Sequence, residues 1–345
     1  MDNSKNSAHR AAVDRLRNKQ RFLSGNDLAQ ALMAGDIRAL AEAITLVESS
    51  RADHQKQAEE LINTVMPHRH KSFRLGLTGV PGVGKSTFIE AFGQHLLSMG
   101  HKLAVLAIDP SSQRSKGSIL GDKTRMETLS QSEGVFIRPS PSADSLGGVA
   151  RKTRESIILC EAAGFDYIIV ETVGVGQSEV EVKSMVDFFL LLMLAGAGDE
   201  LQGIKRGIME MADGLAITKV DGQNGTLAKQ AQRNYKNALH LLPQNENGWI
   251  TEVMLCSALQ GDGFKEIYDH LRSFEERMTA NGFFDGNRME QSLHWMKQTI
   301  ANQLQDRFNS HPEVQLQMPI LAEQVKSAAL SPFRAARLLL EKFFA

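Results

Sequence analysis

Between residues 73 and 256, apolar residues occur in short runs that polar, turn-forming segments separate. Runs that are apolar throughout are typical of strands that helices cover on both faces of a parallel sheet. The sequence therefore predicts an α/β fold with a doubly wound, mainly parallel sheet. The expected strands are Arg74–Thr78, Leu103–Ile108, Val135–Ile137, Tyr167–Val170, Phe188–Leu194, Gly214–Thr218 and Thr251–Cys256.

Helical spacing dominates the two ends of the chain. Apolar positions between Ala29 and Val47 recur with a period close to that of an α-helix, and a second helix is expected at His54–Val65. A glycine-rich bend at Asn281–Asn287 leads to an amphipathic helix, and Ser331-Pro332 is a typical helix start. We therefore expect three parts, namely a helical N-terminal arm at 1–70, an α/β domain at 71–281 and a helical extension at 282–345.

The composition narrows the classes of function. The 345 residues include 39 basic and 40 acidic side chains, so that the chain has no electrostatic footprint for nucleic acid or an anionic membrane. Cys160 and Cys256 stand far apart, which argues against a disulfide scaffold or a zinc site. The polar N-terminus lacks the pattern of a signal peptide, and no apolar run is long enough to span a bilayer. We expect a cytoplasmic protein.

The segment GVPGVGKST at residues 79–87 matches the phosphate-binding pattern G-x-x-x-x-G-K-[ST], and it lies between a predicted strand and a helical stretch. Its glycines allow backbone N–H groups to surround phosphate oxygens, and the helix start adds partial positive charge. Lys85 is expected to reach the β- and γ-phosphates, and the Ser86 hydroxyl to bind magnesium. The expected phosphate-site residues are Gly79, Gly82, Val83, Gly84, Lys85, Ser86 and Thr87.

Acidic residues at strand ends are candidate magnesium ligands. Asp109 follows one predicted strand and Glu171 ends another, and ligands bind at the carboxyl ends of strands in doubly wound sheets. Both carboxylates are therefore expected near Ser86. Asp122, in a polar segment between them, is a third candidate that its position alone does not favour.

The segment that follows Glu171 bears on hydrolysis. Gly174 ends E-T-V-G, a variant of the D-x-x-G element, and its amide is expected to donate to the γ-phosphate. Val175 stands where GTPases usually have the glutamine that orients water, and Gln177 is a weak substitute two residues later. We therefore predict slow intrinsic hydrolysis that a partner accelerates.

Two further strand ends indicate the base. Thr218–Asp221 resembles the guanine-reading N-K-x-D, in which the aspartate accepts hydrogen bonds from guanine N1–H and N2–H₂ that adenine lacks. Sites of this kind reject an analogue without the matching group by roughly 10⁴-fold. Thr218 replaces an asparagine that normally ties this loop to the phosphate loop, so reduced nucleotide affinity is expected. The expected guanine-site residues are Thr218, Lys219, Asp221, Ser257, Ala258 and Leu259.

The stretches GVPGVGKSTFIEAFG, VLAIDPSS, GSILGDKTRM and ETVGVGQSE together resemble the MeaB/ArgK family of P-loop GTPases. The resemblance covers nearly the whole chain. It implies GTP/GDP and Mg²⁺ as ligands, an adenosylcobalamin-dependent acyl-CoA mutase as partner, and a homodimer built largely with the C-terminal helices.

Individual positions follow from the same resemblance. It implies that Ser86, Asp109, Asp122 and Glu171 form the magnesium neighbourhood, which raises the rank of Asp122. It also implies that residues 196–205 form an extra switch, with Lys205 entering the active site when the partner binds. Lys116 stands where the family usually has glycine.

The leading hypothesis is a GTPase chaperone that gates adenosylcobalamin loading of a methylmalonyl-CoA mutase-type enzyme and protects it, with the cofactor held by the partner. Two alternatives stay open. A metal-insertion GTPase usually needs a Cys/His cluster, and the 10 histidines are scattered. A P-loop kinase of a transport protein needs an arginine-rich lid, for which Arg151 and Arg154 are the available residues.

Overall fold

The computed structural model describes residues 25–108, 126–139, 146–172, 178–195, 206–243, 245 and 247–344. The chain divides into two compact units, residues 1–287 and 288–345. The three-part division with boundaries after residues 70 and 281 remains a prediction.

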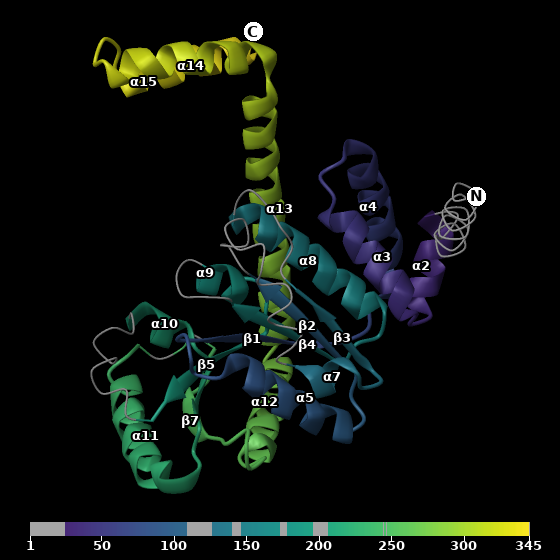
Figure 1. The fold of residues 1–345 in the computed structure, drawn as a ribbon, viewed down its shortest axis with the longest axis vertical. Helices are drawn as coiled ribbons and strands as arrows, with labels where there is room; N and C mark the ends of the chain where they lie inside the picture. Colours follow the sequence, from purple (N-terminus) through teal and green to yellow (C-terminus); the bar gives the residue numbers. More distant parts are fainter. Residues whose placement is uncertain are drawn as a thin grey trace, which may run out of the picture. The chain divides into compact units, whose positions relative to one another are not determined.

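The described part of the first unit contains one parallel sheet with the strand order β3-β2-β4-β1-β5-β6-β7 (Figure 1). The prediction of a doubly wound parallel sheet is confirmed, and every expected strand is present with small differences at its ends. Central β1 lies between β4 and β5, so that the segments following these strands meet at one edge of the sheet. The strands are β1 (Phe73–Gly79), β2 (Leu103–Ile108), β3 (Val135–Arg138), β4 (Tyr167–Thr172), β5 (Phe188–Leu194), β6 (Gly214–Thr218) and β7 (Glu252–Leu255).

Helices cover both faces of this sheet, which explains why its strands are mainly apolar (Figure 1). Helices α5 (Lys85–Ser98) and α12 (Phe264–Ala280), with the short α7 (Glu127–Ser130), pack against alternate strand residues such as Leu75 and Leu77. The other face carries α8 (Leu146–Ala162), α9 (Ser178–Lys183), α10 (Arg206–Met211) and α11 (Gly225–Leu239).

The described part of the N-terminal arm contains α2 (Gly25–Met33), α3 (Ile37–Glu48) and α4 (Ala52–Val65), which pack on one another and on α8. The expectation of one continuous helix at Ala29–Val47 is wrong. The side chain of Asp36 accepts hydrogen bonds from the backbone N–H groups of Arg38 and Ala39, at 2.7 and 3.2 Å. Aspartate is a favoured helix N-cap, so that a new helix starts here although the apolar spacing continues.

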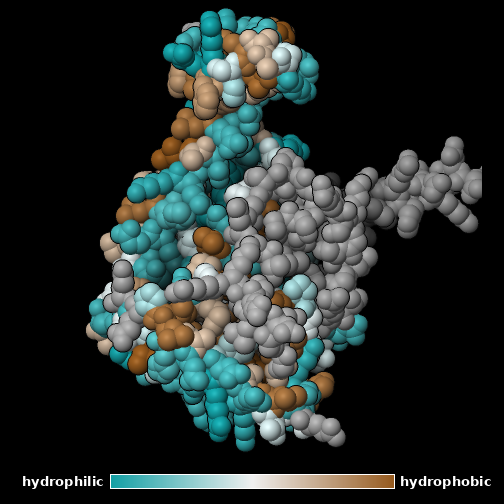
Figure 2. Space-filling view, turned by 90° about the vertical axis from the view of Figure 1, so that its left-hand side faces the viewer, coloured by the Kyte–Doolittle hydropathy of each residue, from teal (hydrophilic) through white to brown (hydrophobic). Residues whose placement is uncertain are grey.

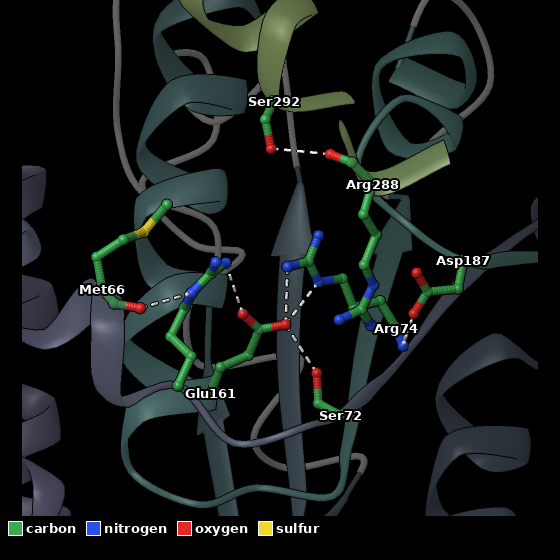
Figure 3. Close-up of polar contacts among 8 residues, drawn as sticks. Met66, Ser72, Arg74, Glu161, Asp187, Arg288 and Ser292 are labelled. Atoms are coloured by element: carbon green, nitrogen blue, oxygen red, sulfur yellow. Dashed lines mark hydrogen bonds and ion pairs between the residues drawn. The ribbon is translucent and has the colours of Figure 1, made fainter. Parts of the chain in front are cut away.

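A buried ionic cluster fastens the segment between this arm and the sheet to the end of α8 (Figure 3). One carboxylate oxygen of Glu161 accepts a hydrogen bond from Ser72 Oγ at 2.8 Å and another from Arg74 Nε at 2.8 Å. Arg69 lies 3.3 Å from the other oxygen, and Asp187 accepts the backbone N–H of Arg74 at 2.7 Å. The side chains of Arg74 and Glu161 are 3% and 1% exposed, so this ion pair is withdrawn from water.

The Glu161→Gln variant is expected to lower the free energy of unfolding by about 3–5 kcal/mol, because it leaves the Arg74 guanidinium buried without a full counter-charge. Urea unfolding followed by circular dichroism measures the loss. Asp53→Asn is the control, since it breaks the Arg51–Asp53 pair, whose side chains are 68% and 54% exposed, and should leave the midpoint unchanged. Equal midpoints for the two variants would contradict a stabilising role for the cluster.

Three helices form the C-terminal part, α13 (Phe283–Ser310), α14 (Pro312–Lys326) and α15 (Pro332–Phe344). The predicted bend at Asn281–Asn287 is too long, because the Asn281 side chain accepts the backbone N–H of Phe283 at 3.0 Å and the helix begins there. Helix α14 was not predicted, since Pro319 in its interior conceals it. Helix α15 begins as predicted, and Ser331 Oγ accepts the backbone N–H of Arg334 at 3.2 Å.

The apolar stripe predicted on α13 is present and faces solvent. Leu293, Met296, Ile300 and Leu304 are between 47% and 54% exposed. Apolar side chains on the C-terminal helices appear as brown patches in Figure 2. In the part of the chain that the structure describes, no helix combines the length and the apolar character needed to cross a bilayer.

Candidate functional site

The loop at residues 80–84 joins β1 to α5 at the carboxyl edge of the sheet, as the phosphate-binding motif requires. A Cβ atom at Gly79 would lie 2.7 Å from the carbonyl oxygen of Leu192, so only glycine fits beside β5. Gly84 has a φ of 95° and is the N-cap of α5, a left-handed conformation that glycine adopts without strain. The loop therefore turns sharply and presents the start of α5 at the edge of the sheet.

Lys85 is the first residue of α5, and its ammonium group bends back over the loop. Its Nζ donates a hydrogen bond to the carbonyl oxygen of Gly79 at 2.8 Å. Burial lowers the pKa of Lys85, whereas the nearby charges of Glu171 and Glu179 raise it. Two carboxylates therefore act on the charge of the phosphate lysine, and of these only Glu171 was predicted from the sequence.

Glu171 lies near the end of β4, where a magnesium ligand was expected. It is buried, with 6% of its surface exposed, and its register partner on β1 is Leu77, two residues before Gly79. Next to it, Thr172 Oγ1 donates to Thr78 Oγ1 at 2.9 Å. A carboxylate therefore projects from the strand beside the phosphate loop. Five other predicted residues lie outside the described ranges, namely Asp109, Asp122, Gly174, Gln177 and Lys205.

The loop after β6 is bonded directly to the phosphate loop. Thr218 Oγ1 donates to the carbonyl oxygen of Val83 at 2.7 Å and lies 3.3 Å from that of Met193. Lys219 Nζ donates to the carbonyl oxygen of Gly82 at 2.8 Å. The tie that an asparagine was expected to provide is therefore made by the threonine hydroxyl, while the expected loss of nucleotide affinity remains a prediction.

The Thr218→Val variant should weaken nucleotide binding about tenfold, because it removes the hydroxyl and leaves buried carbonyl oxygens without their donor, a loss of about 1–3 kcal/mol. Titration with a fluorescent guanine nucleotide measures the change. Thr64→Val, an exposed site in α4 whose hydroxyl bonds to Glu60, is the matched control. Unchanged affinity in Thr218→Val would show that the tie contributes nothing to binding.

The loops that follow β6 and β7 together support Asp221, the side chain expected to select guanine. Lys219 has a φ of 57°, an uncommon conformation for a residue other than glycine. Asp221 follows it, and its Oδ2 accepts a hydrogen bond from Ser257 Oγ at 3.0 Å. Ser257 is fully buried and pairs through its backbone with Asp262 at 3.0 and 3.1 Å. The carboxylate of Asp221 is thus held in one orientation by the loop that follows β7.

A cavity of about 220 Å³ lies between these loops and α5. Ser86, half-buried in α5, and Gly82, on the outer turn of the loop, are not among the residues that line it. Phe88 and Cys256 are cavity residues that the sequence analysis missed, although each stands directly beside a predicted motif. Burial raises the pKa of the Cys256 thiol to about 12. The lining residues are Val83, Gly84, Thr87, Phe88, Thr218, Lys219, Asp221, Cys256, Ala258 and Leu259.

The lining indicates what this cavity can accept. Phe88 and Leu259 supply apolar surface, while Asp221 supplies acceptors and the backbone of Ala258 supplies a donor. A flat base with donor groups on one edge matches this set, and the adjoining loop and Lys85 match the phosphates. The roles of the individual residues in binding remain predictions.

Comparison with known proteins agrees with this site. The family model described as methylmalonyl Co-A mutase-associated GTPase MeaB matches residues 40–313. A putative GTPase of Caulobacter vibrioides is 50% identical over 318 residues, which cover 92% of this chain and 97% of that protein. The methylmalonic aciduria type A homolog of Mus musculus, a mitochondrial protein, is 47% identical over 335 residues, which cover 94% and 80%.

The chain is also similar to a solved structure. The crystal structure of a LAO/AO transport system kinase superposes with a TM-score of 0.73 at 38% sequence identity and covers 93% of this chain and 98% of its own. The phosphate loop, the strand order and the family match therefore agree, and the chain belongs to the MeaB family of methylmalonyl-CoA mutase-associated GTPases.

Proposed function

We propose that this protein is a GTP-hydrolysing chaperone of an adenosylcobalamin-dependent acyl-CoA mutase of the methylmalonyl-CoA mutase type. In this proposal GTP binding and hydrolysis gate loading of the cofactor, which only the mutase holds, and protect the loaded enzyme. The observation that carries the proposal is the joined site, in which Thr218 and Lys219 bind carbonyl oxygens of the phosphate loop beside the Asp221 cavity.

The described residues fit a magnesium-bound guanine nucleotide. Lys85 at the start of α5 supplies a cation for phosphate oxygens, and Glu171 supplies a buried oxygen donor at the same edge of the sheet. Ser86, Asp109, Asp122 and Glu171 would hold the ion. Bound magnesium would neutralise charge on the β- and γ-phosphate oxygens. Lys85 and the amide of Gly174 would bind the γ-phosphate.

Slow hydrolysis by the isolated protein, with acceleration by the mutase, belongs to the same proposal. Val175 cannot orient water, and Gln177 is the nearest amide side chain in the sequence. We propose that Lys205, at the end of the 196–205 segment, completes the site when the mutase is bound. A cytoplasmic location also remains part of the proposal.

The exposed stripe on α13 supports a homodimer as the working unit. Four apolar side chains at helical spacing, Leu293, Met296, Ile300 and Leu304, present a surface that soluble helices usually bury. Sedimentation equilibrium would detect the dimer, and a monomer at every concentration tested would exclude it.

The test of the chaperone proposal uses the full chain and a purified acyl-CoA mutase of the methylmalonyl-CoA type. We expect a complex whose affinity changes between GDP and a non-hydrolysable GTP analogue, and a rate of adenosylcobalamin transfer to the mutase that follows the nucleotide. A complete lack of association in every nucleotide state would refute the proposal, whatever the GTPase activity.

Phosphorylation of a transport protein is a second candidate, because a 38% identical solved structure carries the name of a transport system kinase. Labelled γ-phosphate distinguishes the two. A GTPase releases the label as inorganic phosphate, whereas a kinase leaves it on an acceptor protein. Label retained on protein would favour the kinase.

A further inference from the structure

Two buried threonines are bonded to each other where the central strands reach the nucleotide site. Thr78 directly precedes Gly79 at the end of β1, and Thr172 is the last residue of β4. Thr172 Oγ1 donates to Thr78 Oγ1 at 2.9 Å, and Thr172 and Thr78 are 0% and 1% exposed. Burying a hydroxyl group is costly unless it is hydrogen-bonded, and valine has the same shape without that need. The hydroxyl pair therefore needs an explanation that an apolar core does not supply.

The pair continues the contact between β1 and β4 after the register of these strands ends. Their last register pair is Leu77 with Glu171. Beyond it, each strand stays paired with its other neighbour, since β1 pairs with β5 as far as Gly79 and β4 pairs with β2 as far as Thr172. The two threonines occupy the next positions on β1 and β4. The bond between their side chains thus takes the place of a further backbone pair between the central strands.

Each threonine adjoins a residue of the nucleotide site. Thr78 precedes Gly79, whose carbonyl oxygen accepts the hydrogen bond from Lys85 Nζ at 2.8 Å. Thr172 follows Glu171, the buried carboxylate that is expected to bind magnesium. Because neighbouring residues of a strand move together, the bond between the threonines fixes how far this carboxylate lies from the phosphate loop.

The threonines and Glu171 lie on opposite faces of the sheet. Leu77, the register partner of Glu171, belongs to the core that the sheet shares with α5. On the other face, a Cβ atom at Gly76 would lie 2.9 Å from the side chain of Val182 in α9. Successive side chains of a strand alternate between the faces, so Glu171 lies on the face of α5 and the threonines lie on the face of α9. The pair can therefore support the carboxylate from behind.

We infer that Thr172, through its bond to Thr78, is a positioning residue for the magnesium-bound triphosphate, an inference that rests on the proposed GTPase function. The bond holds the end of β4 against the end of β1. It thereby keeps the Glu171 carboxylate at the distance from the phosphate loop that an ion shared with the β- and γ-phosphates requires. Residues that orient a metal ligand typically contribute about 10–100-fold to metal affinity or activity. Thr172 needs no contact with the ion or the nucleotide to act in this way.

The test compares Thr172→Val with Thr153→Val. Both substitutions remove a buried hydroxyl group and keep the shape of the side chain, but Thr153 bonds within α8, to the carbonyl oxygen of Val149 at 3.0 Å. A fluorescent GTP analogue, titrated with magnesium and in its absence, separates binding of the ion from binding of the nucleotide. We expect Thr172→Val to need about tenfold more magnesium for half of the magnesium-induced gain in affinity. Thr153→Val should keep the wild-type response, and neither substitution should change affinity without magnesium.

The double variant Thr78→Val/Thr172→Val separates positioning from stability. Replacing both partners of a buried hydrogen bond by apolar groups of the same shape is nearly neutral for stability. We therefore expect the double variant to regain the thermal unfolding midpoint that Thr172→Val loses, while its magnesium response stays shifted because the bond is still missing. Thr172→Ser keeps the hydroxyl group and should respond to magnesium as the wild type does. Should Thr172→Val fail to fold, the double variant and Thr172→Ser provide the comparison.

Two results would overturn the inference. One is a wild-type magnesium response in Thr172→Val. The other is recovery of both the midpoint and the magnesium response in the double variant, because packing alone would then explain the pair. Failure of the proposed function looks different, since in that case the unmodified chain would neither bind nor hydrolyse GTP.

Discussion

In the Asp221→Asn variant, the preference for GTP over other purine nucleoside triphosphates is expected to fall about 10⁴-fold. The variant should also gain binding of xanthosine triphosphate. The carboxylate of Asp221 matches the N1–H and N2–H₂ donors of guanine, and an asparagine amide would place a donor against one of them. Xanthine carries an oxygen at that position and therefore pairs with the amide. Since Ser257 Oγ holds Asp221 at 3.0 Å, the replaced side chain cannot turn away freely.

Competition binding with GTP, ATP and xanthosine triphosphate measures this change. Asp262→Asn serves as the control, because Asp262 is joined to the same loop through its backbone bonds to Ser257, which the substitution keeps. The control should keep the preference of the wild type for GTP. Equal affinity of the wild type for ATP and GTP, or an unaltered preference in Asp221→Asn, would show that this aspartate does not read the base.

The second large effect is expected from Lys85→Ala, which should lower the rate of GTP hydrolysis about a thousandfold, as loss of one donor to developing transition-state charge typically does. Alanine is a strong helix former and should keep the start of α5, and the substitution removes the bond from Lys85 Nζ to the Gly79 carbonyl oxygen. It also removes the cation on which the charges of Glu171 and Glu179 act, so that these negative charges are no longer compensated when phosphates bind.

Phosphate release under saturating GTP and magnesium measures this loss, and affinity for GTP should fall as well. Lys102→Ala, at an exposed position just before β2, tests for a general effect of removing a lysine and should retain full activity. Wild-type hydrolysis by Lys85→Ala would show that nucleotide chemistry takes place elsewhere in the protein.

Most strands were predictable from sequence because they are buried on both faces, which makes apolar runs such as Phe188–Leu194 unambiguous. The break between α2 and α3 was missed because the apolar spacing continues across it, although Gly35, with a φ of 81°, and the cap at Asp36 both mark it. Helix α14 was missed for the opposite reason, since Pro319 argues against a helix that packing nevertheless stabilises.

In the candidate site, too, some features were predictable from sequence and others were not. The phosphate and base loops were found because their chemistry depends on short, ordered motifs at strand ends. Two features needed the fold. The bond from Thr218 to the Val83 carbonyl joins loops that are far apart in the chain, and no residue near Glu179 in the sequence indicates that this carboxylate is fully buried. Contacts between distant segments leave no periodic trace in a sequence.

The attachment of the N-terminal arm determines how this protein can be shortened. A recombinant fragment beginning at residue 71 would keep Ser72 and Arg74 but lose Arg69, one of the partners of Glu161. It would also expose to water the surface of α8 that α3 and α4 cover. Such a fragment is prone to aggregation, and its low activity would reflect an uncovered helix rather than a defect in the nucleotide site.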